Sequence, residues 1–253
     1  MSLHSLDLLK KTVTAGLCAV ALACFAACGG GKAEPPADLS TFAPGIYAHL
    51  VSSHGEVIFQ LLPERAPKTV ATLIGLANGL HPFYDPRSGD IHTGHFYDGL
   101  IFHRLVPDFV VQGGDIYGTG SGTPGFQVVE DPALAEQWTY EDTGDVGAAS
   151  RDAGVNGSQF FFTLRACPEL NGRNTMFGRI VRGQETLEAM AEVPLNRFQR
   201  EMPLDTIRIR SLRIYEVGAD GSVRLAALPD GVELPAPVAP KPGEMRDEVE
   251  EDL

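Results

Sequence analysis

The sequence lacks a net basic charge, and this absence excludes two classes of partner. Lys and Arg number 20 against 33 Asp and Glu, which leaves a formal net charge of −13 at pH 7. Proteins that bind nucleic acid carry a basic face, and adhesion to anionic lipid headgroups needs clustered Lys and Arg. The folded part of the chain is therefore expected to bind neither nucleic acid nor a lipid headgroup surface.

Cysteines are also scarce, and the four present cannot form a disulfide framework. Three of them, Cys18, Cys24 and Cys28, lie close to the N-terminus, which leaves Cys167 alone in the rest of the chain. If the N-terminal segment is removed on export, no intrachain disulfide can form. Cys167 is expected to be a small packing residue. The spacing of His, Cys and acidic residues matches no standard ligand pattern, so neither a metal nor another cofactor is expected.

The hydrophobic run near the N-terminus is short for a bilayer span. Residues 12–27 follow Lys10 and Lys11 and have the length of a signal-peptide core. The run ends in FAAC before GGGK, and small residues directly before Cys28 resemble the lipobox of bacterial lipoproteins, whose cysteine becomes the lipidated first residue. Residues 1–27 are therefore predicted to be a lipoprotein signal peptide. Cys24 is the rival lipidation site, and a plain secretory signal cleaved nearby is the alternative interpretation.

Composition divides the remaining chain into three parts. Residues 28–45 are rich in Gly and Pro and are predicted to be a flexible tether. Residues 46–217 alternate apolar runs with glycine-rich turns and form the expected folded domain. Residues 218–253 are proline-rich and then acidic, so we predict a disordered tail that follows a last hairpin near Asp220 and Gly221.

Within the expected domain, the pattern predicts many short strands and two helices. The first helix begins at Pro67 and stops near Gly79, and the second covers 184–193. No internal repeat is visible. Many short strands with two helices favour a closed or nearly closed antiparallel barrel. The predicted strands are 46–51 and 56–62, joined as a hairpin, and then 100–106, 108–114, 126–129, 145–150, 158–164, 176–181 and 206–217.

Three longer motifs are far more specific than these patterns. They are IFHRLVPDFVVQGGD (101–115), NGSQFFFTL (156–164) and LNGRNTMFGRIV (170–181), supported by ERAPKTV and FYDG. Over about residues 46–217 the chain resembles the cyclophilin family of peptidyl-prolyl cis-trans isomerases. The resemblance implies a mainly β fold, a closed eight-stranded antiparallel barrel capped by two α-helices, with a proline-binding groove on its outer surface. It also gives a reason for Arg104, a guanidinium at the centre of an apolar strand-like run.

The resemblance implies roles for individual residues. Arg104 matches the catalytic arginine, and Gln112 matches the glutamine that binds the substrate carbonyl or steadies the arginine. An apolar pocket would hold the proline ring, and a strand edge would hydrogen-bond the substrate backbone. The substrate-binding residues so implied are Phe109, Val110, Phe161 and Leu170 in the pocket, Ala149 and Ser150 at the edge, and Gln159 and Asn174 beside them.

The chain departs from the family pattern in several places. Asn174 stands where a histidine is usual, and Ser150 replaces an asparagine. Glu169 stands where the best-known eukaryotic members carry tryptophan. Residues 81–95, with three histidines, look like an insertion, which we interpret as a solvated loop beside the groove; the alternative is a metal site.

We therefore expect a peptidylprolyl isomerase that accelerates rotation of X–Pro bonds in exported proteins and assists their folding. Its partners would be proline-containing segments of those proteins, and its location the bacterial cell envelope, lipid-anchored and facing the periplasm. No signal for oligomerisation is present, so a monomer is expected. The alternative is a membrane-tethered module that binds proline-containing segments with little turnover.

Overall fold

The computed structural model describes residues 34–36, 38–150, 152–196 and 201–239, all but Glu34 within one compact unit that begins at Pro35. The predicted signal peptide, residues 1–27, and the predicted lipidation site that follows it, Cys28, lie outside these ranges. Among the described residues, no helix has the length and apolar character needed to cross a bilayer.

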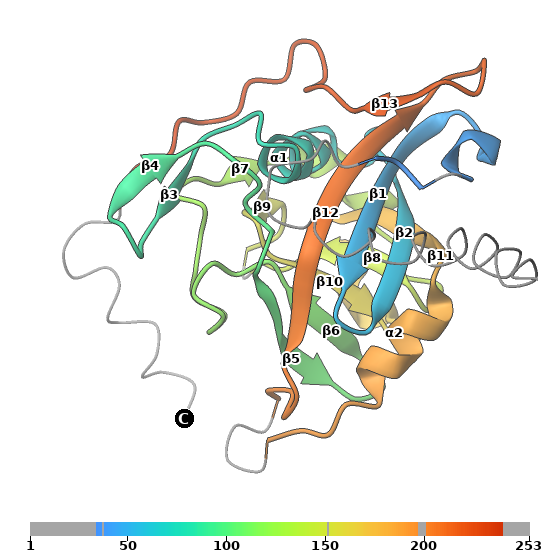
Figure 1. The fold of residues 1–253 in the computed structure, drawn as a ribbon, viewed down its shortest axis with the longest axis vertical. Coiled ribbons are helices and arrows are strands. Elements are labelled where there is room, and N and C mark those ends of the chain that lie inside the picture. Colours follow the sequence, from blue (N-terminus) through green and yellow to red (C-terminus); the bar gives the residue numbers. More distant parts are fainter. Residues whose placement is uncertain (1–33, 37, 151, 197–200, 240–253) are drawn as a thin grey trace, which may run out of the picture. The chain divides into compact units, whose positions relative to one another are not determined.

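A closed, fully antiparallel barrel forms the centre of the unit (Figure 1). Neighbouring strands follow the order β1-β2-β11-β8-β10-β6-β5-β12, and β12 pairs back with β1. This confirms the predicted closed eight-stranded barrel. The strands are β1 Gly45–Ser52, β2 Gly55–Leu61, β5 Ile101–Val106, β6 Val110–Gly113, β8 Asp145–Ala148, β10 Phe160–Thr163, β11 Met176–Arg182 and β12 Ile207–Val217.

Strand β12 closes the barrel because it is long enough to serve two neighbours. Its register with β1 runs from Gly45 opposite Val217 to Ser52 opposite Ile209, while its first residue, Ile207, pairs with Phe102 of β5. Ile207 and Ile209 are fully buried, whereas the arginines that alternate with them are exposed. This period of two is what a strand requires when one face packs on a core and the other meets water.

Two helices lie at opposite ends of the barrel, α1 Pro67–Ala77 and α2 Gln184–Ala191 (Figure 1). Both were predicted, and Pro67 occupies the first turn of α1, where its missing N–H costs nothing. The shorter elements are η1 Leu39–Thr41, β3 Phe83–Asp85, β4 Asp90–His92, β7 Val128–Val129, η2 Pro132–Gln137, β9 Val155–Asn156, η3 Pro168–Leu170 and β13 Val223–Leu225.

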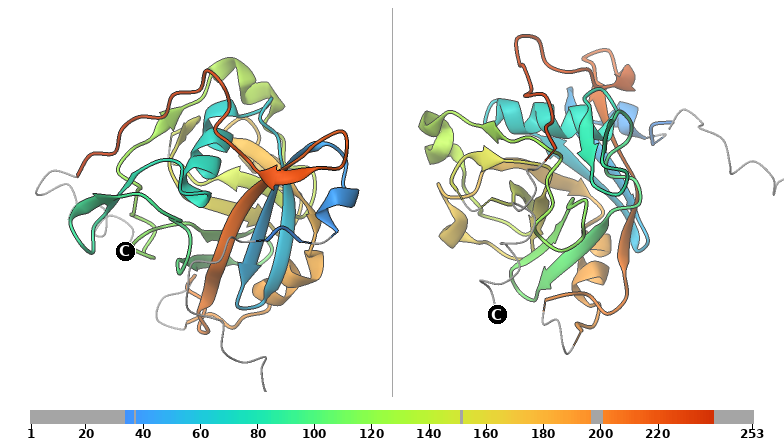
Figure 2. Two further views of the ribbon diagram at one scale, coloured as in Figure 1. Left: turned by 45° about the horizontal axis from the view of Figure 1, so that its top comes forward. Right: turned by 90° about the vertical axis from the view of Figure 1, so that its left-hand side faces the viewer.

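The described residues beyond Gly218, up to 239, differ from the disordered tail that the composition predicts, and the rest of that predicted tail, 240–253, lies outside the described residues. The predicted hairpin is present, since β13 pairs with β12, and residues 226–239, here called the strap, continue over α1 (Figures 1 and 2). Ala226 is buried in the main core, and Leu228 and Leu234 pack against that core. A few well-spaced apolar side chains on a preformed helix surface suffice to hold this segment, although its composition could not build a core by itself.

Two hydrogen-bonding contacts fix the strap at its ends. At the start, the Asn78 side-chain amide donates to the carbonyls of Ala226 at 3.0 Å and Ile214 at 2.9 Å. Near the end, Val238 N donates to Gly125 O at 2.9 Å. The strap and His81 together cover α1 at Gly75, where an added Cβ would lie 2.9 Å from His81 and 3.2 Å from Leu234.

The end of the predicted tether also packs on the barrel. Leu39 of η1 is fully buried, and Phe42 meets Tyr47 of β1 edge-to-face with ring centroids 5.2 Å apart. The Tyr47 hydroxyl donates to Ala43 O at 2.9 Å. The described residues from Asp38 to Pro44 are therefore part of the folded unit and not flexible tether.

The insertion at 81–95 contains a small hairpin, β3–β4, where we expected a solvated loop. Phe83 is buried and packs edge-to-face on Phe96 at 4.9 Å, so the hairpin is attached to the core by one aromatic side chain. Tyr84 N also donates to Pro124 O at 2.9 Å. In the part of the chain that the structure describes, no group of three His, Cys, Asp or Glu side chains could hold a metal ion.

Candidate active site

A β-bulge in β5 sets the direction of Arg104. Phe102 pairs with Gly113 of β6 and Arg104 pairs with the next residue, Gln112, so His103 is the extra residue of the bulge. Bulges shift the alternation of side chains and are common beside functional sites because they re-aim a side chain. The bulge turns the guanidinium toward the outer face of the barrel, where it is about one third exposed (35%).

Five directly paired positions form a row across the outer face of the barrel, from Arg104 to Met176. The pairs are Arg104–Gln112, Gln112–Phe161, Phe161–Gly147 and Gly147–Met176, on strands β5, β6, β10, β8 and β11. Directly opposite residues of antiparallel strands point to the same face of a sheet. Their strand neighbours, such as Leu105, Val111, Phe160 and Phe177, lie in the main core instead. We call these five positions the cross-strand row.

The apolar half of the cross-strand row forms a second, smaller cluster outside the barrel. Phe161 and Met176 are almost completely buried there, with Val110. Phe109, Leu170 and Ala149 pack on them while remaining half-exposed. The predicted pocket residues Phe109, Val110, Phe161 and Leu170 thus come together in one apolar cluster.

Gly147 makes room for the Phe161 ring. A Cβ at position 147 would overlap both the end of that ring and the hydroxyl of Tyr140. The Tyr140 ring stacks on Phe161 from the other side, with centroids 5.7 Å apart and an interplanar angle of 26°. Burial raises the pKa of Tyr140 well above 10.0, so its hydroxyl keeps its proton and donates to Asn174 O at 3.3 Å.

The polar half of the cross-strand row is a chain of hydrogen bonds. Arg104 Nη1 donates to Gln112 Oε1 at 3.2 Å, and Gln112 Nε2 donates to Gln159 Oε1 at 3.0 Å. Gln159 Nε2 in turn donates to Gly120 O at 2.9 Å and Gly122 O at 3.0 Å. The glycine-rich stretch from Gly118 to Gly125 therefore fixes the orientation of both glutamine amides.

A groove continues the apolar cluster toward the predicted strand edge. Its volume is about 370 Å³, and Ser150, Leu170 and Asn174 are among its lining residues. Asn174 Nδ2 donates to Ala148 O at 3.2 Å, and Ala149 N donates to Gln159 O at 3.0 Å, so the edge is supported from both sides. Every predicted substrate-binding residue except Gln159 lies either in this groove or in the cluster beside it, and Gln159 belongs to the hydrogen-bond chain that starts at Arg104. The remaining lining residues are Asp152, Ala153, Glu169 and Arg173.

A charged pair borders the pocket. The Arg165 guanidinium lies 5.7 Å from the centroid of the Phe109 ring, within reach of a cation–π contact, and donates to Glu169 Oε1 at 2.5 Å. This hydrogen bond lowers the pKa of Glu169 below its usual 4.5, so both charges persist at neutral pH. The tryptophan position of the family is thus occupied here by half of an exposed ion pair.

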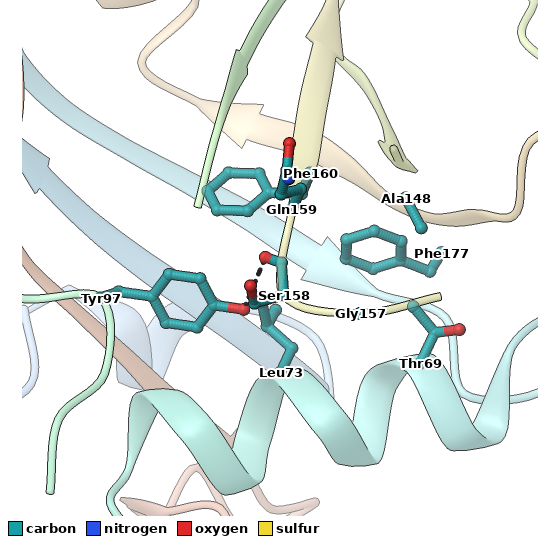
Figure 3. A pocket seen from close by; sticks show the side chains of 9 residues that line it. All are labelled: Thr69, Leu73, Tyr97, Ala148, Gly157, Ser158, Gln159, Phe160 and Phe177. Carbon is teal, nitrogen blue, oxygen red and sulfur yellow. Dashed lines mark hydrogen bonds between the residues drawn. The ribbon is translucent and has the colours of Figure 1, made fainter. Parts of the chain in front are cut away.

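A small cavity lies between α1 and the residues that lead into β10 (Figure 3). Thr69 and Leu73 of α1 line it together with Tyr97 and the segment from Gly157 to Phe160. Its volume of about 10 Å³ is the space of one water molecule. The Tyr97 hydroxyl donates to Ser158 O at 3.0 Å, which holds the start of β10 against the helix side (Figure 3).

Two important neighbours of Arg104 were not identified from the sequence. Glu201 accepts a hydrogen bond from Arg104 Nε at 2.5 Å, although it lies 97 positions away in the sequence. His103 is buried, and neither ring nitrogen has a hydrogen-bond partner among the described residues. Nothing in the run EMPLD around Glu201 signals such a contact, whereas His103 lay inside a recognised motif and could have been singled out by its place next to Arg104.

The fold and this surface define a class, a closed mainly β barrel with an apolar pocket and an arginine on its outer face. Residues 47–214 match the family model described as cyclophilin type peptidyl-prolyl cis-trans isomerase/CLD. Peptidyl-prolyl cis-trans isomerase B of Streptomyces anulatus is 35% identical over 174 residues, which cover 67% of this chain and 97% of that protein. Peptidyl-prolyl cis-trans isomerase A of Mycobacterium tuberculosis is 36% identical over 171 residues, which cover 66% and 91%.

Solved structures agree with the sequence relatives. A cyclophilin-type isomerase of Cryptosporidium parvum superposes with a TM-score of 0.54 at 29% identity, over 66% of this chain and 96% of that one. A structure of the same isomerase in the presence of the dipeptide Ala-Pro gives a TM-score of 0.53 at 28% identity, with the same coverage. The chain therefore belongs to the cyclophilin-type peptidyl-prolyl cis-trans isomerase family, and its enzyme class is peptidylprolyl isomerase.

Proposed function

We propose that this isomerase works on exported proteins, from a lipid anchor at Cys28 in the envelope of a bacterial cell, and assists their folding. The N-terminal pattern of two lysines, a short apolar run and FAAC supports export and lipidation. The proposed substrates are proline-containing segments of unfolded or partly folded chains. The anchored enzyme would face the periplasm, where such chains emerge.

The reaction needs no covalent chemistry. The peptide bond resists rotation by about 18–20 kcal/mol because its C–N bond has partial double-bond character. At X–Pro bonds, uncatalysed exchange takes tens to hundreds of seconds. In the twisted state the prolyl nitrogen regains its lone pair and can accept a hydrogen bond. A fixed donor aimed at that nitrogen therefore stabilises the transition state more than the ground state.

The observation that carries the proposal is the cross-strand row, which sets a guanidinium next to an apolar pocket on one face of the barrel. The pocket of Phe109, Val110, Phe161 and Leu170 would hold the proline ring. Arg104 would donate to the prolyl nitrogen, since arginine stays charged and offers several donors in one rigid plane. Gln112, which already accepts from Arg104 Nη1, would keep that plane in place or bind a substrate carbonyl.

The proposed backbone contacts complete the binding mode. Ala149 and Ser150 would hydrogen-bond the extended substrate on one side of the proline, with Gln159 behind them. Asn174 would offer a side-chain amide at the pocket's far wall. Because an amide does not titrate, this contact would be independent of pH.

Arg104→Ala tests the mechanism. A charge-assisted hydrogen bond is worth about 1.5–3 kcal/mol, and about 1.4 kcal/mol corresponds to tenfold, so kcat/KM should fall about 10- to 100-fold. A protease-coupled assay on an Ala-Ala-Pro-Phe type peptide at low temperature measures the effect. Arg104→Lys should recover little, because lysine lacks the planar fork. Arg224→Ala, which removes an exposed arginine paired with Glu216, is the matched control and should leave kcat/KM unchanged.

Full activity in a folded Arg104→Ala protein would contradict the proposal and favour the alternative, a module that binds proline-containing segments. If Arg104→Ala lowered both the melting temperature and kcat/KM, and Arg104→Lys restored both, Arg104 would instead be a structural ion-pair partner. Circular dichroism melts of the variants, run alongside the assays, separate these outcomes.

A further inference from the structure

The Glu201 carboxylate accepts a hydrogen bond from the Nε–H of Arg104. The Nε to Oε2 distance is 2.5 Å, and Gln112 holds one Nη1 proton, at 3.2 Å. The structure gives no acceptor for Nη2 among the described residues. Because arginine has five N–H groups in one plane, fixing Nε and Nη1 on their two edges leaves the remaining donors at a defined orientation.

The backbone at Glu201 is held in place by main-chain hydrogen bonds. Leu105 N, the residue after Arg104, donates to Glu201 O at 2.6 Å, which attaches this segment to β5. Residues on either side of Glu201 also pair with each other, since Leu195 and Pro203 form an isolated antiparallel bridge and Leu204 N donates to Pro194 O at 2.7 Å. The segment that returns from α2 therefore meets β5 at the residue beside Arg104.

The pair is too exposed to be explained as a stabilising ion pair. Its two side chains are 35% and 50% exposed, and ion pairs in such settings add little to the free energy of unfolding. The carboxylate even compensates part of the charge that a transition state would use. What the contact does supply is orientation, since a guanidinium on a flexible side chain otherwise rotates about its last bonds. An orienting partner next to a catalytic donor is how a site avoids the cost of reorganisation during the reaction.

We propose that Glu201 is a positioning residue, which acts through Arg104 by fixing the guanidinium plane so that its free edge faces the proline pocket. This inference rests on the proposed role of Arg104. It adds that the glutamate on the segment after α2 and Gln112 on β6 grip the guanidinium from two sides. Loss of Glu201 lets the plane rotate, so kcat falls while the apolar pocket, and with it KM, is unchanged.

The test is a double-mutant cycle on the full-length protein, with the variants Glu201→Ala, Arg104→Ala and both together. Glu201→Ala should lower kcat/KM about tenfold, the scale of a loosened reacting geometry. Adding it to Arg104→Ala should cause no further loss. Exchange spectroscopy by NMR at saturating peptide should place the loss in kcat, with KM within about twofold, and the melting temperature should stay within about 2 °C.

Two further variants make the result specific. Glu201→Gln keeps an acceptor oxygen for Nε and should restore most of the activity. Asp205→Asn removes an exposed acid from the same segment and should behave like the natural protein. The inference would be overturned if Glu201→Ala had the same kcat/KM as the unmodified protein. It would also be overturned if Glu201→Ala lowered kcat/KM by the same factor in the unmodified protein and in Arg104→Ala. If Arg104→Ala itself keeps full activity, the proposed function fails first and is identified as the cause.

Discussion

Gly147 shows how one missing side chain shapes the pocket. Its position in the cross-strand row places the Phe161 ring directly above it, and any Cβ would overlap that ring and the Tyr140 hydroxyl. Both aromatic side chains are almost completely buried, so neither can move aside without disturbing the apolar cluster. The floor of the pocket therefore depends on glycine at 147.

Gly147→Ala should lower both stability and activity. Overpacking of this kind costs about 1–3 kcal/mol of unfolding free energy, and displacement of Phe161 should reduce kcat/KM at least about tenfold. Thermal melts and the coupled assay measure the two effects. Gly94→Ala is the control, because a Cβ there meets nothing within 4 Å. Natural values of both quantities in Gly147→Ala would show that the ring has room to shift.

His103 should make stability depend on pH. Burial lowers its pKa from the usual 6.5, the nearby Arg104 charge lowers it further, and Asp115 opposes both effects. The unfolded chain then binds a proton more readily than the folded one. The stability contributed by the neutral ring is therefore complete above about pH 6.5 and is lost as the pH falls toward the folded-state pKa.

The melting temperature should accordingly fall between pH 7.5 and pH 5.5, and His103→Gln should reduce that fall. His54→Gln, on the exposed turn between β1 and β2, is the control and should leave it unchanged. An identical pH dependence in His103→Gln and the natural protein would mean that the titration of other groups accounts for the effect.

At this scale the sequence predicts the residues inside motifs and misses those held by distant contacts. Arg104, Gln112 and Phe161 were predicted because each lies in a long specific run, and the structure brings them into one row. Glu201 could not be predicted, since its contact with Arg104 depends on how the chain returns from α2 to β5. The local sequence around Glu201 does not indicate the path that the chain takes from α2 to β5.

The strap is the element whose prediction failed, and the reason is physical. Proline content and acidity describe whether a segment can fold alone, but the strap folds against α1 and needs only Ala226, Leu228 and Leu234 to bury. His81 of the 81–95 insertion also meets it, with Nε2 2.9 Å from Pro235 O. The strap is thus ordered by packing on α1, a helix from a distant part of the sequence.

Removing the strap should destabilise the domain. A chain that stops after Asp230 loses Leu234 and the Val238 N to Gly125 O bond, and should melt several degrees below a chain that stops after Ala239. Comparing these two truncations isolates the described part of the tail, because both lack residues 240–253. Equal melting temperatures would mean that residues 231–239 of the strap contribute nothing to stability.

At the scale of the whole molecule, the fold was the most predictable feature and the anchor the least tested. Alternation of short apolar runs with glycine turns already favoured a barrel, and the motifs identified its family. The pairing of β12 with β1 fits that prediction, because these strands correspond to the first and last apolar runs of the predicted domain. Export and lipidation instead depend on the first residues, which lie outside the described ranges.

Cys28→Ala should abolish labelling with radioactive fatty acid and move the protein from the membrane fraction to the soluble one. Cys24→Ala, four residues earlier, is the matched control and should label normally. Labelling that persists in Cys28→Ala but disappears in Cys24→Ala would move the anchor to the rival cysteine. Labelling of neither the natural protein nor the variants would favour a plain secretory signal.

The pairing of β1 with β12 also sets the order in which the molecule can assemble. Gly45 meets Val217, so β1 leaves the ribosome long before its second partner exists. Until then β1 has only the β2 hairpin, and its other edge is an open template for pairing with foreign strands. Barrels built on such long-range contacts fold slowly and late. A nascent chain of this protein therefore carries one unpaired strand edge until β12, the last strand of the barrel, has been synthesised.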